Sequence, residues 1–381
     1  MLTSLLKLSK SSIVYILLIF TPIAIALEFT HADHIIIFVI TAIALIPLAK
    51  LIGDSTEHLS VHYGATLGSL LNVTFGNAAE IIIAIVAINA GLIDLVKASI
   101  TGAILGNILL IFGLSILAGG FRFKEQFFNR ENVSLQASML FLAIIGLAVP
   151  TILVNTVDNA NVEGEVSIQI LSDALAFLLL TVYAAGIIFT FFTHKHLFIQ
   201  PHSGKELQEK SEEAREGGEE QKYEEAHILW SKKKSFFFLG LSMAGVIMVS
   251  EILVGSVEAT TQEFGFGELF VGAIIIGIVG NAAEHSSAIL LARKGKIDLS
   301  IGIAAGSGTQ IALFVVPVLL IAGITMNQPF TLVFTLFELA TIFLAAIILN
   351  LIAHDGKSNW FEGVMLTAVY IIIAIGFFFI Q

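Results

Sequence analysis

Long apolar blocks dominate the hydrophobic pattern of this chain, and short polar stretches separate them. Each block is about twenty residues long, the length at which an α-helix crosses the roughly 30 Å apolar core of a bilayer. The pattern predicts eleven spans and therefore an all-α polytopic membrane protein. They lie near residues 12–27, 34–52, 64–89, 95–118, 134–154, 168–192, 235–256, 267–292, 299–323, 330–352 and 361–380.

The distribution of lysine and arginine supports this count and orients the chain. If the N-terminus lies in the cytoplasm and the spans alternate, only Lys97 of the 19 lysines and arginines falls on the outer side. Cytoplasmic loops carry such an excess of basic residues. We therefore expect an outer C-terminus and a plasma (inner) membrane location, although a vacuolar membrane gives the same orientation. The first block also resembles a signal peptide, so that alternative stays open.

Composition adds two constraints. The chain is 56% hydrophobic and only 13% charged, whereas a soluble protein carries about a quarter charged residues. It has no cysteine, which excludes disulfides and thiolate metal sites. The net charge of −11 comes mostly from loops, above all from a glutamate-rich stretch between residues 205 and 225. That stretch is either a solvated linker or an acidic helix that senses cations.

A pentapeptide occurs twice, each time inside an apolar block. The sequence GNAAE occupies Gly76–Glu80 and returns, 204 residues later, at Gly280–Glu284. The same offset relates further residues without a gap, which predicts two related halves of five spans each. Because five is an odd number, the second half must enter the membrane from the opposite side, as in the inverted repeats of transporters. The expected units are an N-terminal helix (1–33), a first repeat (34–192), an acidic linker (193–234) and a second repeat (235–381).

The repeated glutamates, Glu80 and Glu284, fall near the middle of their predicted spans. A charged side chain at that depth costs roughly 2.5–3.5 kcal/mol. The cost falls if the two carboxylates share a dication or become protonated, and burial favours protonation. Carboxylate, amide and backbone oxygens form a hard site that suits Ca²⁺. The alternative is that each glutamate is only a structural hydrogen-bond partner, which the duplication disfavours.

With these motifs, the sequence resembles the cation/proton exchanger (CAX) family, the Ca²⁺/H⁺ antiporters of the Ca²⁺/cation antiporter superfamily. The likeness covers nearly the whole chain and includes STEHLS at residues 55–60, where His58 replaces the acidic residue expected from the family. The resemblance implies exchange of Ca²⁺ for H⁺, with Glu80 and Glu284 binding both ions. It also implies a site lined by Asn77, Asn281, Ser307 and Gln310.

Three further polar residues have two interpretations each. His285 follows Glu284 and either relays protons to it or is a packing contact. Glu57 and Glu258 lie near the ends of spans, where they could form cation entrances on the two sides or be solvated acids.

Three other functions compete with Ca²⁺/H⁺ exchange. A Na⁺/Ca²⁺ exchanger of the same superfamily would carry hydroxyls beside the repeated glutamate, where this chain has alanines. An intramembrane hydrolase or another enzyme would need an acid–base dyad at mid-depth, and none is evident. A passive channel is disfavoured by the inverted repeat. The expected partners are the lipid bilayer, Ca²⁺ and H⁺, with no nucleic acid; assembly with further copies of the chain is left open.

Overall fold

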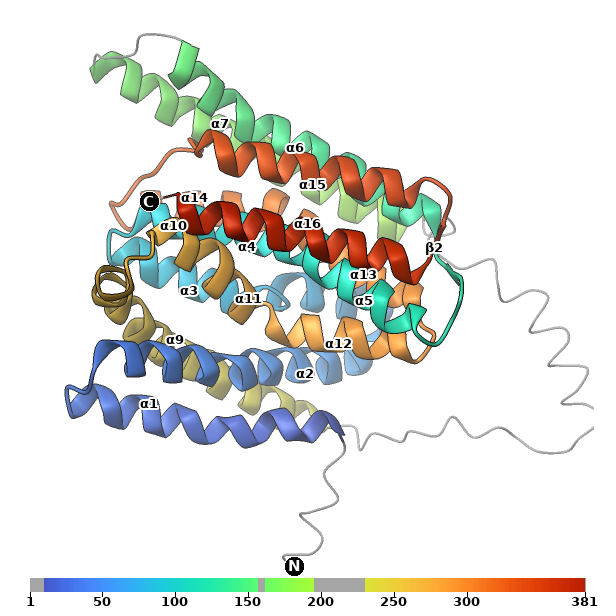
Figure 1. The fold of residues 1–381 in the computed structure, drawn as a ribbon, viewed down its shortest axis with the longest axis horizontal. Coiled ribbons are helices and arrows are strands. Elements are labelled where there is room, and N and C mark those ends of the chain that lie inside the picture. The colour runs from blue at the N-terminus through green and yellow to red at the C-terminus, as the bar shows by residue number, and fades with distance from the viewer. Residues whose placement is uncertain (1–9, 157–161, 195–229, 381) are drawn as a thin grey trace, which may run out of the picture.

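The computed structural model describes residues 10–156, 162–194 and 230–380, and it is a bundle of helices that run side by side (Figure 1). The acidic stretch 205–225 lies outside the described residues. The elements of the first half are η1 (Lys10–Ile19), α1 (Phe20–Phe29), α2 (His34–Phe75), α3 (Ala78–Asn89), α4 (Ile93–Leu105), η2 (Gly106–Ile111), α5 (Phe112–Gly120), β1 (Gln126–Phe127), α6 (Arg130–Thr156), α7 (Val162–Ile188) and η3 (Phe189–Thr193).

The second half likewise consists of long helices and short helical segments. Its elements are α9 (Lys232–Phe264), α10 (Glu268–Phe270), η5 (Val271–Ile276), α11 (Gly277–Gly280), α12 (Ala282–Arg293), α13 (Ile297–Gln310), η6 (Ile311–Val315), α14 (Val316–Thr325), α15 (Leu336–Ala353), β2 (Lys357–Ser358) and α16 (Trp360–Phe379). The strands β1 and β2 form a two-residue antiparallel pair, which joins the loop after α5 to the loop before α16. The elements named η2, η3, η5 and η6 are π-helical turns.

Eight helices of the described residues are long and apolar enough to cross a membrane, and a ninth span is the pair 268–280 and 282–293, bent by 58°. Two more predicted spans correspond to shorter apolar helices, 14–29 and 78–89. The structure therefore supports a polytopic helical membrane protein. Large apolar side chains are exposed on the outer helices, among them Ile145 of α6, Phe177 of α7 and Ile372 of α16, as lipid contact requires.

One boundary in the first half needs correction. The sequence pattern left residues 53–63 between two spans, but this polar stretch is helical: α2 runs over His34–Phe75, and its part of membrane-spanning length is His34–Tyr63. Two hydroxyls of the stretch bond to the backbone one turn earlier. Ser55 donates to the carbonyl of Leu51 at 2.6 Å, and Thr56 donates to that of Ile52 at 2.8 Å.

The helix breaks instead inside the repeated pentapeptide. Gly76 and Asn77 form a turn between α2 and α3, and Asn281 occupies the equivalent break before α12. Gly76, Asn77 and Glu80 therefore do not lie on one continuous helix, although the pattern predicted an unbroken span over residues 64–89. Each asparagine is instead the residue that precedes a half-helix, as in the discontinuous helices of transporters.

Helix bounds after the two breaks agree between the halves. α3 and α12 are both 12 residues long, and α4 and α13 begin 204 residues apart. The turns between them also match: Gly91 has φ +79° and Gly295 has φ +78°, a left-handed conformation that glycine adopts without strain. The backbone N–H groups of Leu92 and Lys296 close these turns with bonds of 3.0 Å.

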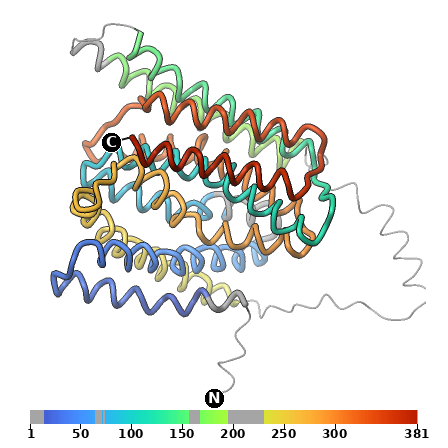
Figure 2. Tube along the Cα trace, in the orientation of Figure 1, coloured from blue at the N-terminus to red at the C-terminus, as the bar shows by residue number. Residues whose placement is uncertain are grey.

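Helices of the two halves interleave rather than forming separate bodies. Figure 1 shows α1 and α2 along one edge of the bundle and α6, α7 and α15 along the other, and the trace in Figure 2 shows the broken helices between them. The tightest contact joins α4 to η5, where a Cβ added to Gly102 would lie 1.9 Å from the carbonyl oxygen of Ala273. Small residues permit this approach of two backbones.

Candidate functional site

The two glutamates of the repeat lie in the first turn of their half-helices. Glu80 is the third residue of α3, and Glu284 is the third residue of α12. The backbone carbonyls of Asn77 and Asn281 begin these helices, because they accept bonds of 3.0 Å from the N–H groups of Ile81 and His285. A helix N-terminus carries a partial positive charge, which stabilises a carboxylate beside it. The breaks in the two spans therefore place both acids where a buried negative charge is best tolerated.

Glu80 extends into a cavity between the halves. The cavity is mostly apolar. It is lined by Glu80, Ile83, Ala84, Ser99, Ile100, Ala103, Ile276, Gly277, Gly280, Asn281, Ile311, Val315 and Leu319. A Cβ added to Gly280 would lie 3.3 Å from Oε1 of Glu80, so the glycine of the second pentapeptide makes room for the glutamate of the first.

Amide and hydroxyl groups from both halves connect around the two breaks. The Asn77 amide donates to Oε1 of Gln310 at 3.0 Å, and the Ser307 hydroxyl donates to Oδ1 of Asn77 at 3.3 Å. Asn281 donates to the carbonyl of Gly277 at 3.1 Å. The Ser307 hydroxyl also accepts a bond of 3.2 Å from the Asn107 amide. The structure thus brings together six residues singled out from the sequence: Glu80, Glu284, Asn77, Asn281, Ser307 and Gln310.

Asn107 belongs to the same group, and the analysis of the sequence missed it. Its amide donates to Oδ1 of Asn281 at 3.3 Å and to the hydroxyl of Ser307 at 3.2 Å, and the residue is fully buried in η2. One signal could have found it. Gly106-Asn107 is a third Gly-Asn pair inside an apolar block, although it lacks the glutamate of the other two.

Several oxygen atoms of this group are buried and unpaired. Oε2 of Glu80, Oε2 of Glu284 and Oδ1 of Asn107 have no hydrogen-bond partner among the residues that the structure describes. Buried polar atoms are normally satisfied, and an unpaired buried charge is costly. These oxygens can be satisfied by a cation that they coordinate together or by protons on the carboxyl groups.

The remaining predicted site residues lie outside this network. His285 is buried, and its imidazole lies beside Gly106, where a Cβ would come within 4.0 Å of Cε1. Glu57 is exposed on α2. Glu258 is exposed on α9, accepts a bond of 3.4 Å from Gln262 and is electrostatically coupled to Glu268. The structure shows no hydrogen bond from these three side chains to the amide network.

Fold and site together define a polytopic helical membrane protein with a buried site of paired carboxylates at two helix breaks. The sequence profile of the sodium/calcium exchanger protein family matches residues 34–195 and 234–379, and the chain belongs to this family.

Relatives of known activity and structure resemble the chain over nearly its whole length. A "Ca(2+)/H(+) antiporter" of Aphanothece halophytica is 43% identical over 98% of both chains. The "Ca(2+)/H(+) antiporter ChaA" of Bacillus subtilis is 38% identical over 94% of this chain and 96% of its own. The solved structure of native YfkE superposes with a TM-score of 0.78 at 35% identity, over 96% of this chain and 99% of the other.

Proposed function

We propose that this protein is a secondary active antiporter that exchanges Ca²⁺ for H⁺ and removes Ca²⁺ from the cytosol by alternating access. The observation that carries the proposal is the pair Glu80 and Glu284, each in the first turn of a half-helix and each with an unpaired buried oxygen. The names of the relatives, Ca²⁺/H⁺ antiporters among them, support the same activity.

The proposed Ca²⁺ site draws on both halves. Glu80 and Glu284 supply the charge that balances the dication, and the amide and hydroxyl groups of Asn77, Asn281, Ser307, Gln310 and Asn107 supply or orient neutral oxygens. Hard oxygen donors of this kind suit Ca²⁺, which takes six to eight of them in flexible geometry. In this site Ca²⁺ is the transported substrate and H⁺ the counter-ion.

Exchange follows from the charge of the two carboxylates. Two negative charges in an apolar environment are stable when one Ca²⁺ bridges them or when protons neutralise them. Protons that reach the site from the opposite side remove the charge that holds Ca²⁺ and therefore release it. The empty site carries two unbalanced negative charges and therefore has a high free energy. The protein consequently switches between its inward-facing and outward-facing conformations only when Ca²⁺ or protons occupy the site.

An inverted repeat of two five-helix units, preceded by one extra helix, gives eleven spans and places this site at the repeat interface. Helix contacts support that arrangement because they are reciprocal: when a helix of the first half contacts one of the second, their equivalents are also in contact. α3 packs on α9 and α12 on α2, and likewise α5 packs on α16 and α14 on α7. A two-fold axis relating the halves requires this reciprocity. The units proposed are 34–192 and 235–381, with 1–33 and the acidic linker 193–234 outside them.

The orientation we propose has a cytoplasmic N-terminus and an outer C-terminus in the plasma (inner) membrane, because lysine and arginine concentrate in the segments this places inside. In this orientation Glu57 lies at the cytoplasmic entrance and Glu258 at the outer one. His285, beside Glu284, would tune or relay its protons.

Na⁺ as the counter-ion is the second candidate, and one feature separates the two. A Na⁺ site needs oxygen ligands beyond those that bind Ca²⁺. The residues beside the two glutamates are Ala78, Ala79, Ala282 and Ala283, which offer no side-chain oxygen. Protons need only the carboxylates themselves.

The test is uptake of ⁴⁵Ca²⁺ into proteoliposomes driven by an imposed pH gradient, compared with an imposed Na⁺ gradient. Glu80→Gln and Glu284→Gln keep the shape of the side chain but remove one charge and one proton acceptor. Each change should lower uptake by at least about 100-fold, because an amide can neither balance Ca²⁺ nor carry the proton.

The matched control is Glu125→Gln, the same change at an exposed glutamate that pairs with Lys357 at 3.7 Å. This variant should transport at the wild-type rate. Retention of most of the rate in both site variants, with insertion verified, would contradict the shared site. Uptake that follows the Na⁺ gradient instead would favour the second candidate.

A further inference from the structure

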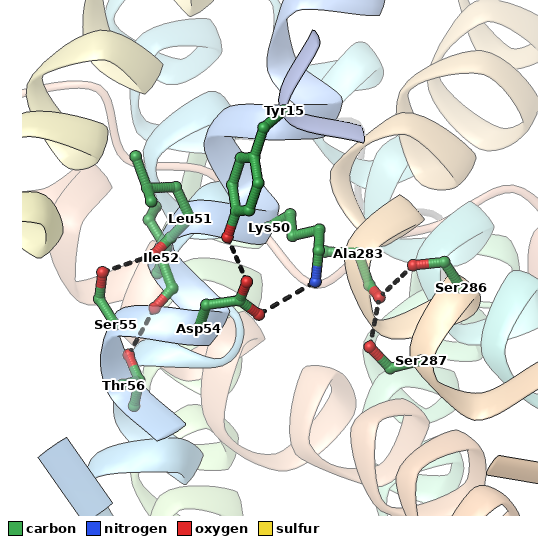
Figure 3. A network of polar contacts seen from close by, with 10 residues as sticks. All are labelled: Tyr15, Lys50, Leu51, Ile52, Asp54, Ser55, Thr56, Ala283, Ser286 and Ser287. Carbon is green, nitrogen blue, oxygen red and sulfur yellow. Dashed lines mark hydrogen bonds and ion pairs between the residues drawn. The ribbon is translucent and has the colours of Figure 1, made fainter. Parts of the chain in front are cut away.

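A polar cluster that the exchange mechanism does not use lies where the N-terminal helix meets α2. The Lys50 ammonium pairs with Oδ1 of Asp54 at 3.0 Å and lies 5.9 Å from the ring centroid of Tyr15. The Tyr15 hydroxyl donates to the other carboxylate oxygen of Asp54. Figure 3 shows Asp54 held between the two side chains. The three residues thus form one latch that joins η1 to α2.

The latch buries a positive charge. Lys50 is only 9% exposed, and a lysine at that depth is stable only when it is paired. Asp54 and Tyr15 supply the charge and the aromatic face that hold it. Tyr15 comes from the extra N-terminal helix, which lies outside the proposed repeats.

The latch faces the segment that carries Glu284. α12 packs against α2, and Figure 3 shows the Lys50 ammonium directed toward the turn of α12 that contains Ala283, Ser286 and Ser287. Both serine hydroxyls donate to the carbonyl of Ala283, at 2.9 and 3.0 Å. Ala283 precedes Glu284. In the proposed orientation Lys50 lies on the cytoplasmic side, so the ion pair that it forms with Asp54 lies on the side from which cytosolic Ca²⁺ reaches α12.

The equivalent position of the second half lacks this charge. The offset of 204 relates Lys50 to Val254 of α9 and Asp54 to Glu258. Val254 is a buried apolar residue, and Glu258 is exposed to solvent. The two entrances consequently differ. An unneutralised carboxylate lies at the outer end, and a carboxylate neutralised by Lys50 lies at the cytoplasmic end.

We propose that Lys50 is an electrostatic gate at the cytoplasmic entrance and that Tyr15 is a positioning residue that keeps Asp54 within the latch. The inference rests on the proposed function, since it concerns access of Ca²⁺ to the same site. A fixed positive charge lowers the local concentration of a dication, and a free carboxylate raises it. Lys50 thereby sets the cytosolic Ca²⁺ concentration at which exchange is half-saturated, without contacting the bound ion.

A charge cycle on two residues tests the gate. Everted membrane vesicles expose the cytoplasmic face, so the KM for Ca²⁺ measured with an imposed pH gradient reports on this entrance. Lys50→Met frees Asp54 and should lower the KM by about 3- to 10-fold, whereas Asp54→Asn leaves Lys50 unbalanced and should raise it by about the same factor. The neutral double variant, Lys50→Met with Asp54→Asn, should return to within about two-fold of the wild type.

Three further measurements separate a gate from a merely structural role. Lys50→Arg keeps the charge and should keep the KM. Tyr15→Phe keeps the ring but releases one oxygen of Asp54, so it should lower the KM by about two-fold. The differences between variants should shrink at high salt, because the Debye length falls from about 30 Å at 0.01 M to about 3 Å at 1 M. Lys357→Met, the same change at an exposed ion pair, should leave the KM unchanged.

The inference and the proposed function fail in different ways. Wild-type vesicles that take up no Ca²⁺ under a pH gradient would overturn the function. Active wild-type vesicles in which Lys50→Met and Asp54→Asn shift the KM in the same direction, or not at all, would overturn the gate. A double variant whose KM departs from the wild-type value more than that of either single variant would likewise show that the latch contributes only to folding.

Discussion

Helices α4 and α13 occupy equivalent positions in the two halves, yet they contribute different chemistry to the buried site. α13 carries Ser307 and Gln310, which bond with Asn77. The equivalent residues of the first half are Ala103 of α4 and Gly106 of η2, and the polar residue there, Asn107, is the second residue of η2. The helices agree in where they begin, but their polar groups do not. The two helices thus begin at corresponding positions, while the polar side chains near their C-terminal ends differ.

The two helices also differ in how closely they pack against their neighbours. On α4, Gly102 lets the helix approach the backbone of η5. On α13, the equivalent Gly306 has no atom of the described residues within 4 Å of an added Cβ. α4 is thus specialised for close contact between the halves, and α13 for hydrogen bonding to the first pentapeptide.

The largest expected effect tests this packing. Gly102→Ala places a methyl group 1.9 Å from the Ala273 carbonyl oxygen, so the two backbones must separate. Overpacking against a rigid backbone should cost at least about 3 kcal/mol and remove most of the folded, monodisperse protein. Gly306→Ala is the matched change and should keep or slightly raise the yield, because alanine favours a helix. Size-exclusion profiles and thermal melts in detergent measure both; equal losses would refute the difference between the helices.

The next effect compares the two asparagines at the helix breaks. Asn77→Ala removes the partner of both Gln310 and Ser307, whereas Asn281→Ala removes one bond to Asn107 and one within its own half. Each change removes two hydrogen bonds, but both bonds of Asn77 join side chains of the other half, whereas one bond of Asn281 goes to a backbone carbonyl one turn earlier. We therefore expect the KM for Ca²⁺ to rise more in Asn77→Ala, by about 30-fold, than in Asn281→Ala, by about 5-fold. Both variants should still couple uptake to the pH gradient. A larger increase of the KM in Asn281→Ala would contradict the view that the hydrogen bonds from α13 to Asn77 matter most.

A third pair of variants tests whether transport depends on a hydroxyl at position 307 or at the equivalent position 103. Ser307→Ala removes a hydroxyl that links Asn77 to Asn107, and it should lower kcat/KM for Ca²⁺ by about tenfold. Ala103→Ser adds a hydroxyl at the equivalent position of α4, on the wall of the cavity beside Glu80. It should change kcat/KM by less than about two-fold, because the amide network does not reach it. Rescue of Ser307→Ala by Ala103→Ser would show that the halves are interchangeable here.

Much of this organisation could be predicted from the sequence because it depends on local signals. Apolar blocks predicted the positions of the spans. The repeated pentapeptide led to the hypothesis that Glu80 and Glu284 contribute to one binding site. The helix break at Gly76-Asn77 and the continuity of α2 through Ser55 and Thr56 were not predicted. In both places, bonds to the preceding or following turn decide the outcome, and residue type alone does not determine those bonds.

Contacts between segments far apart in the chain could not be predicted from the sequence. Asn107 joins the site only because η2 crosses the second half, and Tyr15 reaches Asp54 only because the N-terminal helix packs along α2. A register of 204 shows which residues are equivalent, but it does not show which of them face each other. Side-chain partners across a helix interface follow from packing, which needs the three-dimensional arrangement.

The smallest expected effect concerns the feature that the halves share most closely, the turns at Gly91 and Gly295. Both glycines have φ near +79°, where a Cβ is strained whatever the space around it. Gly91→Ala should therefore destabilise the protein by about 1 kcal/mol, a shift of about 2–4 °C in Tm. Gly295→Ala should cost slightly more, because its Cβ would lie 3.0 Å from the ring of Phe123, whereas no described atom lies within 4 Å of a Cβ at Gly91. Adding Phe123→Leu should remove that excess and leave the two turns equal in a thermal melt, and a Gly91→Ala variant as stable as the wild type would refute the strain.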